Sequence, residues 1–247
     1  MQRSHIVIYS GGMDSYTLLQ LVRQRMAPND SLRALSFLYG QRHKRELACA
    51  ETVCDMLNVP RVLLDLSCLT AHLKGSSLTD PSIATPHGHY AAANMKQTVV
   101  PGRNTLFLAA ALSLAEATPG DGPVTIYYGA HAGDHHIYPD CRPDYMLVMS
   151  NGIAVASEGR VSLQVPFLHM HKGEILALGL RPRGTTRRAD GGGGGLGLSP
   201  AAYAGTWTCY EGGAVPCGQC GACQERAEAF AFAGAADPLL ETQGAVA

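Results

Sequence analysis

Four cysteines near the C-terminus carry the clearest chemical signal in this sequence of 247 residues. They stand in the stretch TCYEGGAVPCGQCGAC, with the spacing C-x7-C-x2-C-x2-C, at Cys209, Cys217, Cys220 and Cys223. Four thiolates this close in sequence can close a tetrahedral Zn²⁺ site, and the glycines beside them permit the tight turns that such a site requires. A four-thiolate shell leaves no open coordination position, so we expect one structural zinc per chain. An iron–sulfur cluster is the alternative, because thiolates also hold such clusters.

The stretch YSGGMDS, from Tyr9 to Ser15, indicates a second kind of chemistry. It follows a short apolar run with strand character and precedes leucines that recur at helical spacing. In such a strand–turn–helix unit, backbone N–H groups and the positive end of the helix face an anion. At Gly12 we expect a positive φ angle and a close approach to phosphate oxygens. An ordinary strand-to-helix turn without a ligand explains the local pattern equally well.

Segments with strand and helix character alternate along the chain. The expected strands are residues 6–9, 32–39, 61–65, 124–129 and 162–166. The expected helices are residues 15–25, 44–57, 105–117 and 172–178. This alternation predicts an α/β fold, a Rossmann-like parallel sheet with helices on both faces. Ligands of such sheets bind beyond the carboxyl ends of the strands, where the glycine turn falls.

We expect three regions along the chain: an α/β domain over residues 1–180, a flexible Arg/Gly-rich loop over 181–200, and the four-cysteine element with a C-terminal helix over 201–247. The loop, RPRGTTRRADGGGGGLGLSP, has four arginines, five consecutive glycines and little that could join a core. An RNA-binding arm is an alternative interpretation, although basic, Gly-rich segments without aromatic residues usually stay solvated.

Composition excludes several classes of function. Hydrophobic residues make up 46% of the chain and charged residues 16%, and the net charge is −1. These values describe a globular protein with a substantial core and no general attraction to nucleic acid, so no nucleic-acid partner is expected. No targeting signal is visible, and no apolar run reaches the roughly 20 residues that span a bilayer. We therefore expect a cytoplasmic protein with no membrane partner, whose cysteines are thiols or metal ligands.

Five stretches together resemble a known family. SGGMDS resembles the pyrophosphate-binding loop of the PP-loop ATP pyrophosphatases, which have an adenine nucleotide alpha hydrolase-like fold. Four further stretches, in this order, are similar to the QueC family of 7-cyano-7-deazaguanine synthases: VVPGRNTLFLAAALSLAEA, YPDCRPDY, VPFLHMHKGEI and TWTCYEGGAVPCGQCGACQERAEAF. The resemblance extends along nearly the whole chain, and it identifies residues 1–180 as a PP-loop nucleotide-binding domain.

The resemblance implies an ATP-dependent carbon–nitrogen ligase of queuosine biosynthesis, with ATP and Mg²⁺, 7-carboxy-7-deazaguanine and ammonia as reactants and a homodimer as the assembly. Two alternatives remain. An adenylating enzyme of the same kind could pass a deazaguanine to a macromolecule, because the residues 135–137 and the Arg/Gly-rich loop depart from the family pattern. A PP-loop tRNA sulfurtransferase would instead need reactive cysteines near the glycine turn.

The resemblance also assigns site residues. The ATP-binding set is Tyr9, Ser10, Gly11, Gly12, Met13, Asp14, Ser15, Arg103 and Asn104. The catalytic set is Asp14, which holds Mg²⁺ or caps the helix, Arg103, a forked phosphate donor, and Lys172, a point charge for pyrophosphate. The substrate-binding set is Tyr138 for stacking, Asp140 for the donor edge of the ring, and Arg142 for a carboxylate or phosphate. A second metal site is a weaker hypothesis, at His131, Asp134, His135 and His136.

Overall fold

A five-stranded parallel sheet organises the residues that the computed structural model describes, which are 1–70, 72–89, 92–184 and 194–240. The strands are β1 (Ser4–Ile8), β2 (Ser31–Leu38), β3 (Arg61–Asp65), β4 (Val124–Tyr127) and β5 (Val161–Gln164). Their order in the sheet is β3-β2-β1-β4-β5, and every neighbouring pair is parallel. The parallel sheet expected from the alternating pattern is confirmed.

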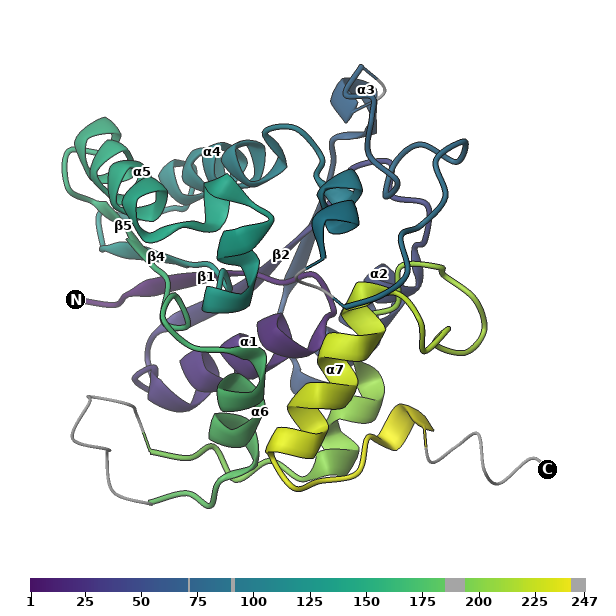
Figure 1. Cartoon of the computed structure of the whole chain (residues 1–247). Helices are drawn as coiled ribbons and strands as arrows, with labels where there is room; N and C mark the ends of the chain where they lie inside the picture. The colour runs from purple at the N-terminus through teal and green to yellow at the C-terminus, as the bar shows by residue number, and fades with distance from the viewer. Residues whose placement is uncertain (71, 90–91, 185–193, 241–247) are drawn as a thin grey trace.

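Helices cover both faces of this sheet (Figure 1). One face carries α4 (Arg103–Glu116) and α5 (Pro143–Ala156), and the other carries α1 (Met13–Arg25), α2 (Arg45–Leu57), α6 (Lys172–Leu180) and α7 (Gly221–Phe232). The central strand shows why both faces are covered, because successive side chains of a strand point to opposite sides. Ile6 and Ile8 enter one core, whereas Val7 and Tyr9 enter the other.

Short helical turns make up the remaining regular structure. They are α3 (Ser67–Thr70) and the 3₁₀ turns η1 (Ala93–Thr98), η2 (Ala132–His136), η3 (Pro139–Cys141) and η4 (Pro200–Gly205). Within the described residues, no helix combines the length and the apolar character needed to cross a membrane. Residues 185–193, which include three of the five consecutive glycines of the expected flexible loop, lie outside the described part of the chain.

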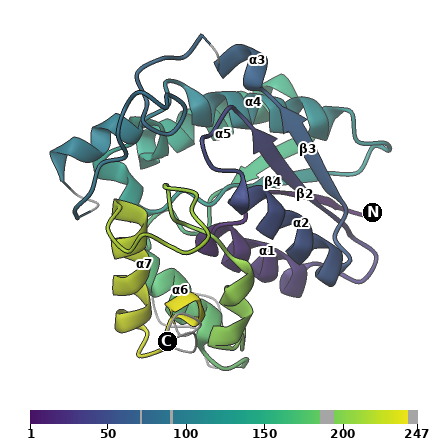
Figure 2. The ribbon, with the colours of Figure 1, turned by 90° about the vertical axis from the view of Figure 1, so that its right-hand side faces the viewer.

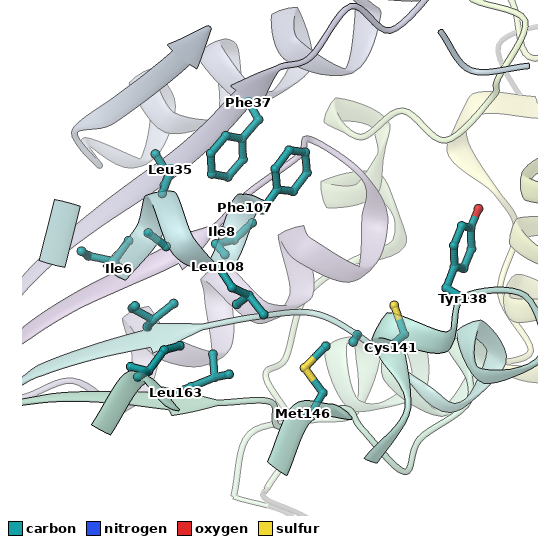
Figure 3. Close-up of a cluster of buried hydrophobic side chains, with 14 of the residues drawn as sticks. Ile6, Ile8, Leu35, Phe37, Phe107, Leu108, Tyr138, Cys141, Met146 and Leu163 are labelled. Carbon is teal, nitrogen blue, oxygen red and sulfur yellow. The ribbon is translucent and has the colours of Figure 1, made fainter. Parts of the chain in front are cut away.

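The core beneath α4 fixes the position of the first turn of that helix (Figure 3). Leu35 and Phe37 of β2 and Leu108 of α4 belong to this core. The rings of Phe37 and Phe107 stack with centroids 4.0 Å apart and an interplanar angle of 3°. Because these contacts anchor α4 to the middle of the sheet, its first residue, Arg103, lies beyond the carboxyl end of β2.

Helix α5 is the helix that the sequence pattern did not predict. Its buried residues are Met146 and Ile153, whereas Leu147, Val148 and Val155 are large apolar side chains that are exposed. Apolar residues therefore occur all round the helix, and the 3.6-residue period that reveals an amphipathic helix is hidden.

The C-terminal segment folds back beside α6 and α1 (Figure 2). The hydroxyls of Tyr203 in η4 and Thr17 in α1 share a hydrogen bond of 2.8 Å. Gly179 of α6 makes room for the Tyr203 ring, because a Cβ at that position would collide with the phenol oxygen. The segment that contains the four cysteines is in this way tied to α1 and α6.

A buried ion pair closes the C-terminal segment. Arg226 of α7 donates to both carboxylate oxygens of Asp237, at 2.7 and 2.9 Å, and the two side chains are 3% and 4% exposed. The same guanidinium donates to the hydroxyl of Thr206 and to the carbonyl of Tyr203. Its donors are therefore well satisfied, as a buried cation requires.

We expect Asp237→Ala to lower the free energy of unfolding by about 3–5 kcal/mol, because Arg226 would remain buried without its counter-ion. Urea denaturation followed by circular dichroism measures this loss. The control is Asp121→Ala, at an exposed position, which should change stability by less than about 0.5 kcal/mol. Equal losses in the two variants would contradict the stabilising role of the pair.

Candidate active site

A cavity of about 230 Å³ lies at the carboxyl ends of β1, β2 and β4. Strands β1 and β4 are neighbours in the sheet although they are not consecutive in the chain, so the cavity sits where the strand order reverses. Ligands of doubly wound sheets bind at that point. The strand ends contribute Tyr9, Phe37 and Tyr128 to the wall, and the segment before the cysteines contributes Trp207.

The loop over residues 9–15 is closed by its own serines. The hydroxyl oxygens of Ser10 and Ser15 lie 3.1 Å apart, and the amide of Gly12 donates to the Ser10 hydroxyl at 3.2 Å. The Ser15 hydroxyl donates to the carbonyl of Gly12 at 3.0 Å. Helix α1 begins at Met13, so the positive end of its dipole lies at this loop. The loop therefore has a defined shape at the positive end of a helix, which is the place where proteins commonly bind anions.

The two glycines of the loop serve different purposes. Gly11 has a φ of 92°, and a Cβ there would collide with the carbonyl of Glu46 in α2. Gly12 has a φ of −78°, which any residue can adopt, so the expectation of a positive φ at Gly12 is wrong. A Cβ at Gly12 would meet the Ser10 hydroxyl at 3.3 Å and the carbonyl of Trp207 at 3.7 Å. Close backbone packing requires Gly11, whereas Gly12 lines the cavity and would accept a Cβ only in tight contact with the Ser10 hydroxyl.

An ion triad lies under this loop. The Nζ atom of Lys172 is 3.0 Å from Oδ2 of Asp14 and 2.8 Å from Oε2 of Glu225. Burial lowers the pKa of Lys172, but the two carboxylates outweigh that effect and raise the pKa well above its ordinary value. Burial likewise raises the pKa of Asp14, yet Lys172 and His131 hold it well below its usual range. Lys172 and Asp14 are therefore both charged.

Asp14 does not cap α1. The N-cap residue is Gly12, which makes no side-chain hydrogen bond, and the carboxylate of Asp14 points instead to Lys172 and to His131, whose Nε2 is 3.6 Å away. The other carboxylate oxygen, Oδ1, is buried and has no hydrogen-bond partner among the described residues. The helix-cap alternative for Asp14 is therefore wrong.

His131 belongs to the same cluster. Burial lowers the pKa of His131, but Asp134 and Asp14 outweigh it and raise the pKa to about 9. The amide of Gly133 donates to Nδ1 at 3.1 Å, so this geometry opposes a second proton on the ring. The hypothesis of a second metal site at His131 and its neighbours finds no support, because the four cysteines are the one group in the described chain that meets the geometry of a metal site.

Arg103 lies in an aromatic cage. Its guanidinium carbon is 5.7, 5.9 and 5.6 Å from the ring centroids of Tyr39, Phe107 and Tyr138. Such contacts stabilise a cation without neutralising it, so the charge remains available to an anion in the cavity. Nε of Arg103 donates to Oδ1 of Asn104 at 3.1 Å, which orients the fork.

The three expected substrate-binding residues lie in different places. Tyr138 lines the cavity, and its hydroxyl is 2.8 Å from the hydroxyl of Thr98. Asp140 accepts from the amide nitrogen of Asn104 at 3.0 Å and so supports the residue that orients Arg103. Arg142 donates to the carbonyl of His135 at 3.0 Å and is exposed. Asp140 and Arg142 are outside the wall of the cavity as the structure has it.

Most of the other expected residues come together in the cavity wall. Its lining includes Tyr9, Ser10, Gly12, Asp14, Ser15, Arg103, Asn104 and Lys172. Gly11 and Met13 lie behind the loop, with Met13 completely buried in the second core.

Sequence reasoning missed several residues of the wall, among them Glu46, Trp207 and Tyr210. An acid in the first turn of a helix that follows a strand end was the available signal for Glu46. The two aromatic residues flank Cys209, and no local pattern shows that they would reach the cavity.

The four cysteines form one compact group. Their sulfur atoms all lie within 4.8 Å of one another, with Cys217 and Cys223 at 3.9 Å. Backbone amides donate hydrogen bonds to the sulfur atoms. The amide of Cys217 donates to the sulfur of Cys209, and the amide of Cys220 donates to the sulfur of Cys217, both at 3.3 Å. This arrangement of soft donors is able to bind a metal ion.

The cysteine group is directly connected to the cavity. Trp207 donates through its backbone amide to the carbonyl of Gly11 and through its indole to the carbonyl of Cys209, both at 3.0 Å. The guanidinium of Arg45 lies over the indole ring at 4.3 Å. One buried residue therefore links the four-cysteine group to the loop over residues 9–15.

Comparison with known proteins agrees with this architecture. The family model described as "Queuosine biosynthesis protein QueC" matches residues 4–234. The curated 7-cyano-7-deazaguanine synthase of Marinobacter nauticus is 46% identical over 239 residues, which cover 97% of this chain and 97% of that protein. The enzyme of the same name from Hahella chejuensis is 44% identical, and the match covers 95% of this chain and 91% of that protein. The one from Methanoregula boonei is 46% identical, and the match covers 95% of this chain and 97% of that protein. The chain therefore belongs to the QueC family.

Proposed function

We propose that the protein is an ATP-dependent ligase that converts 7-carboxy-7-deazaguanine and ammonia to 7-cyano-7-deazaguanine. The observation that carries the proposal is the serine-closed glycine loop at the end of β1, with Lys172 and Arg103 in the wall of the same cavity. Relatives named for this activity, 44–46% identical over almost their whole length, support it.

The reaction needs ATP because a carboxylate resists attack by ammonia. A carboxylate oxygen attacks the α-phosphorus of ATP, pyrophosphate leaves, and the acyl-adenylate forms. Ammonia then displaces AMP and gives the amide. In a second round the amide oxygen attacks another ATP, and loss of AMP with the remaining N–H protons leaves the nitrile. Both rounds require stabilisation of the departing pyrophosphate, which is electrostatic work.

The loop and the cationic groups match that requirement. Ser10, Gly12 and Ser15 present hydroxyl and amide donors at the positive end of α1. Lys172 supplies a charge beneath the loop, and Arg103 supplies a forked donor at its side. Tyr138 offers a ring face to the purine-like substrate, whereas the roles expected of Asp140 and Arg142 stay predictions.

Mg²⁺ fits the same site through Asp14. The buried Oδ1 atom of that carboxylate has no hydrogen-bond partner among the described residues, and a hard oxygen ligand is what Mg²⁺ prefers. When bound, the ion would neutralise charge on the phosphates of ATP.

We propose zinc as the occupant of the four-cysteine group. Four sulfur donors suit a tetrahedral Zn²⁺ ion and leave no position for a substrate, so the ion would be structural. It would hold the segment that carries Trp207 against the loop at Gly11.

A thiolase mechanism is less well supported. Cys141 is the cysteine in the described wall of the cavity, and burial raises its pKa well above the ordinary value. A thiol in that state is a poor nucleophile. The proposal has four further parts. The nitrogen source is free ammonia, the assembly is a homodimer, and the protein is cytoplasmic. The chain divides into three regions, at residues 1–180, 181–200 and 201–247. Size-exclusion chromatography with light scattering tests the dimer.

Incubation of the protein with ATP, 7-carboxy-7-deazaguanine and ammonium tests the proposed activity. We expect mass spectrometry to detect the nitrile with AMP and pyrophosphate as co-products, and steady turnover with ammonium alone. If the acyl-adenylate forms but ammonium does not turn it over, the acceptor is a macromolecule and the ligase proposal is wrong.

A second prediction compares the two loop glycines. Gly12→Val should reduce turnover by about a hundredfold or more with little change in melting temperature, because the backbone tolerates a side chain that blocks phosphate donors. Gly11→Ala should instead lower the melting temperature, because its Cβ collides with the backbone of α2. A fully active Gly12→Val enzyme would contradict phosphate binding by this loop.

A third prediction concerns the metal. Cys220 is completely buried, so Cys220→Ala should leave unfolded or aggregated protein with less than one zinc per chain. Elemental analysis and circular dichroism measure both effects, and Cys68→Ala, at an exposed cysteine outside the group, is the control. Iron with visible absorbance in a normally folded Cys220→Ala protein would contradict the zinc assignment.

A further inference from the structure

Glu46 is a carboxylate in the cavity wall to which the reaction described above gives no role. It lies in the first turn of α2, close to the loop, since its backbone carbonyl packs against Gly11. Its Oε1 atom accepts from the amide nitrogen of Gln41 at 3.4 Å. Oε2 accepts no hydrogen bond from a described residue and is accessible, because it is not among the buried side-chain atoms that lack a partner.

Gln41 holds this carboxylate in a fixed place. The side chain of Gln41 is buried, accepts from the amide of Tyr39 at 2.8 Å and donates to the carbonyl of Phe37 at 3.1 Å. Phe37 lies in β2 and Tyr39 follows its end, so the sheet holds Gln41, whose amide nitrogen is 3.4 Å from Oε1 of Glu46. A side chain so placed is prepared for a ligand, because its position does not depend on one.

The surroundings leave Glu46 in need of donors. Withdrawal from water raises the pKa of Glu46 to about 7, although Gln41 and the guanidinium of Arg103 lower it in part. The side chains of Phe37 and Phe107 line the same cavity and carry no hydrogen-bond donor. A ligand that supplies N–H donors would compensate the cost of burial.

We propose that Glu46 reads the guanine-like edge of the substrate by accepting hydrogen bonds from its N1–H and 2-amino groups. An ionised carboxylate is an acceptor with two oxygens, and this edge presents two donors side by side. The aromatic residues of the cavity wall provide apolar surfaces for the flat ring. This inference rests on the proposed function for the identity of the substrate.

Adenine does not suit the same carboxylate. Its corresponding edge presents one amino donor beside a ring nitrogen that is itself an acceptor, so one carboxylate oxygen would face a lone pair. Asp140, which we expected from the sequence to read the donor edge, is engaged by Asn104. Glu46 therefore distinguishes the deazaguanine from the adenine of ATP.

The test measures KM for each substrate in the full-length protein. Glu46→Gln keeps the shape of the side chain but replaces an acceptor by a donor. We expect it to raise KM for 7-carboxy-7-deazaguanine about 10- to 100-fold and to leave KM for ATP within twofold. Glu51→Gln, at a largely exposed position later in α2, is the matched control and should change neither constant.

A substrate analogue supplies a readout that does not depend on how the variant folds. The wild-type enzyme should use 7-carboxy-7-deazahypoxanthine, which lacks the 2-amino group, at least tenfold less efficiently than the natural compound. In Glu46→Gln that preference should largely disappear. Equal discrimination by both proteins would overturn the proposal, as would a rise in KM for ATP or a fall in kcat with both KM values unchanged.

Failure of the proposed function gives a different result. Equilibrium binding of 7-carboxy-7-deazaguanine, measured by calorimetry without ATP, reports on Glu46 even if the wild-type protein makes no nitrile. Weaker binding to Glu46→Gln than to the wild-type and Glu51→Gln proteins supports the inference. Equal binding to all three overturns it.

Discussion

The site depends on one buried ammonium group, that of Lys172. A cation removed from water is stable only with counter-charges and good geometry, and Asp14 and Glu225 provide them at 3.0 and 2.8 Å. Lys172 is the first residue of α6, Asp14 lies in the first turn of α1, and Glu225 lies in α7. Their attraction therefore holds three helices together at the carboxyl edge of the sheet. An anionic ligand that draws on the charge of Lys172 acts on the same network.

The C-terminal segment completes the candidate site and also carries the four-cysteine group, which is able to bind a metal ion. It brings Glu225 to the triad, Trp207 to the carbonyl of Gly11 and Tyr210 to the cavity wall. The cysteine group and the Arg226–Asp237 pair keep that segment in one conformation. The four-cysteine group and the cavity are therefore connected through the backbone amide and the indole of Trp207.

Local patterns predicted what local physics determines. All five strands, the glycine loop and the four cysteines were visible because alternation, turn chemistry and ligand spacing are written within short stretches. Contacts between residues that are distant in sequence could be found only in the structure. Glu46 of α2 lines the cavity, and Asp140 accepts a hydrogen bond from Asn104, which lies 36 residues earlier in the chain. The positive φ was expected one residue too late, because only the packing of Gly11 on α2 shows which glycine carries it. Helix α5 escaped notice because its apolar residues are not confined to one face.

The central claim is that the cavity transfers AMP to an oxygen of the substrate. The most direct measurement uses 7-carboxy-7-deazaguanine with both carboxylate oxygens replaced by ¹⁸O, followed by mass spectrometry of the nucleotide products. If both rounds proceed through adenylates, each AMP carries one ¹⁸O atom, because the C–O bond breaks when AMP leaves. ADP with labelled inorganic phosphate, or AMP without label, would contradict the account.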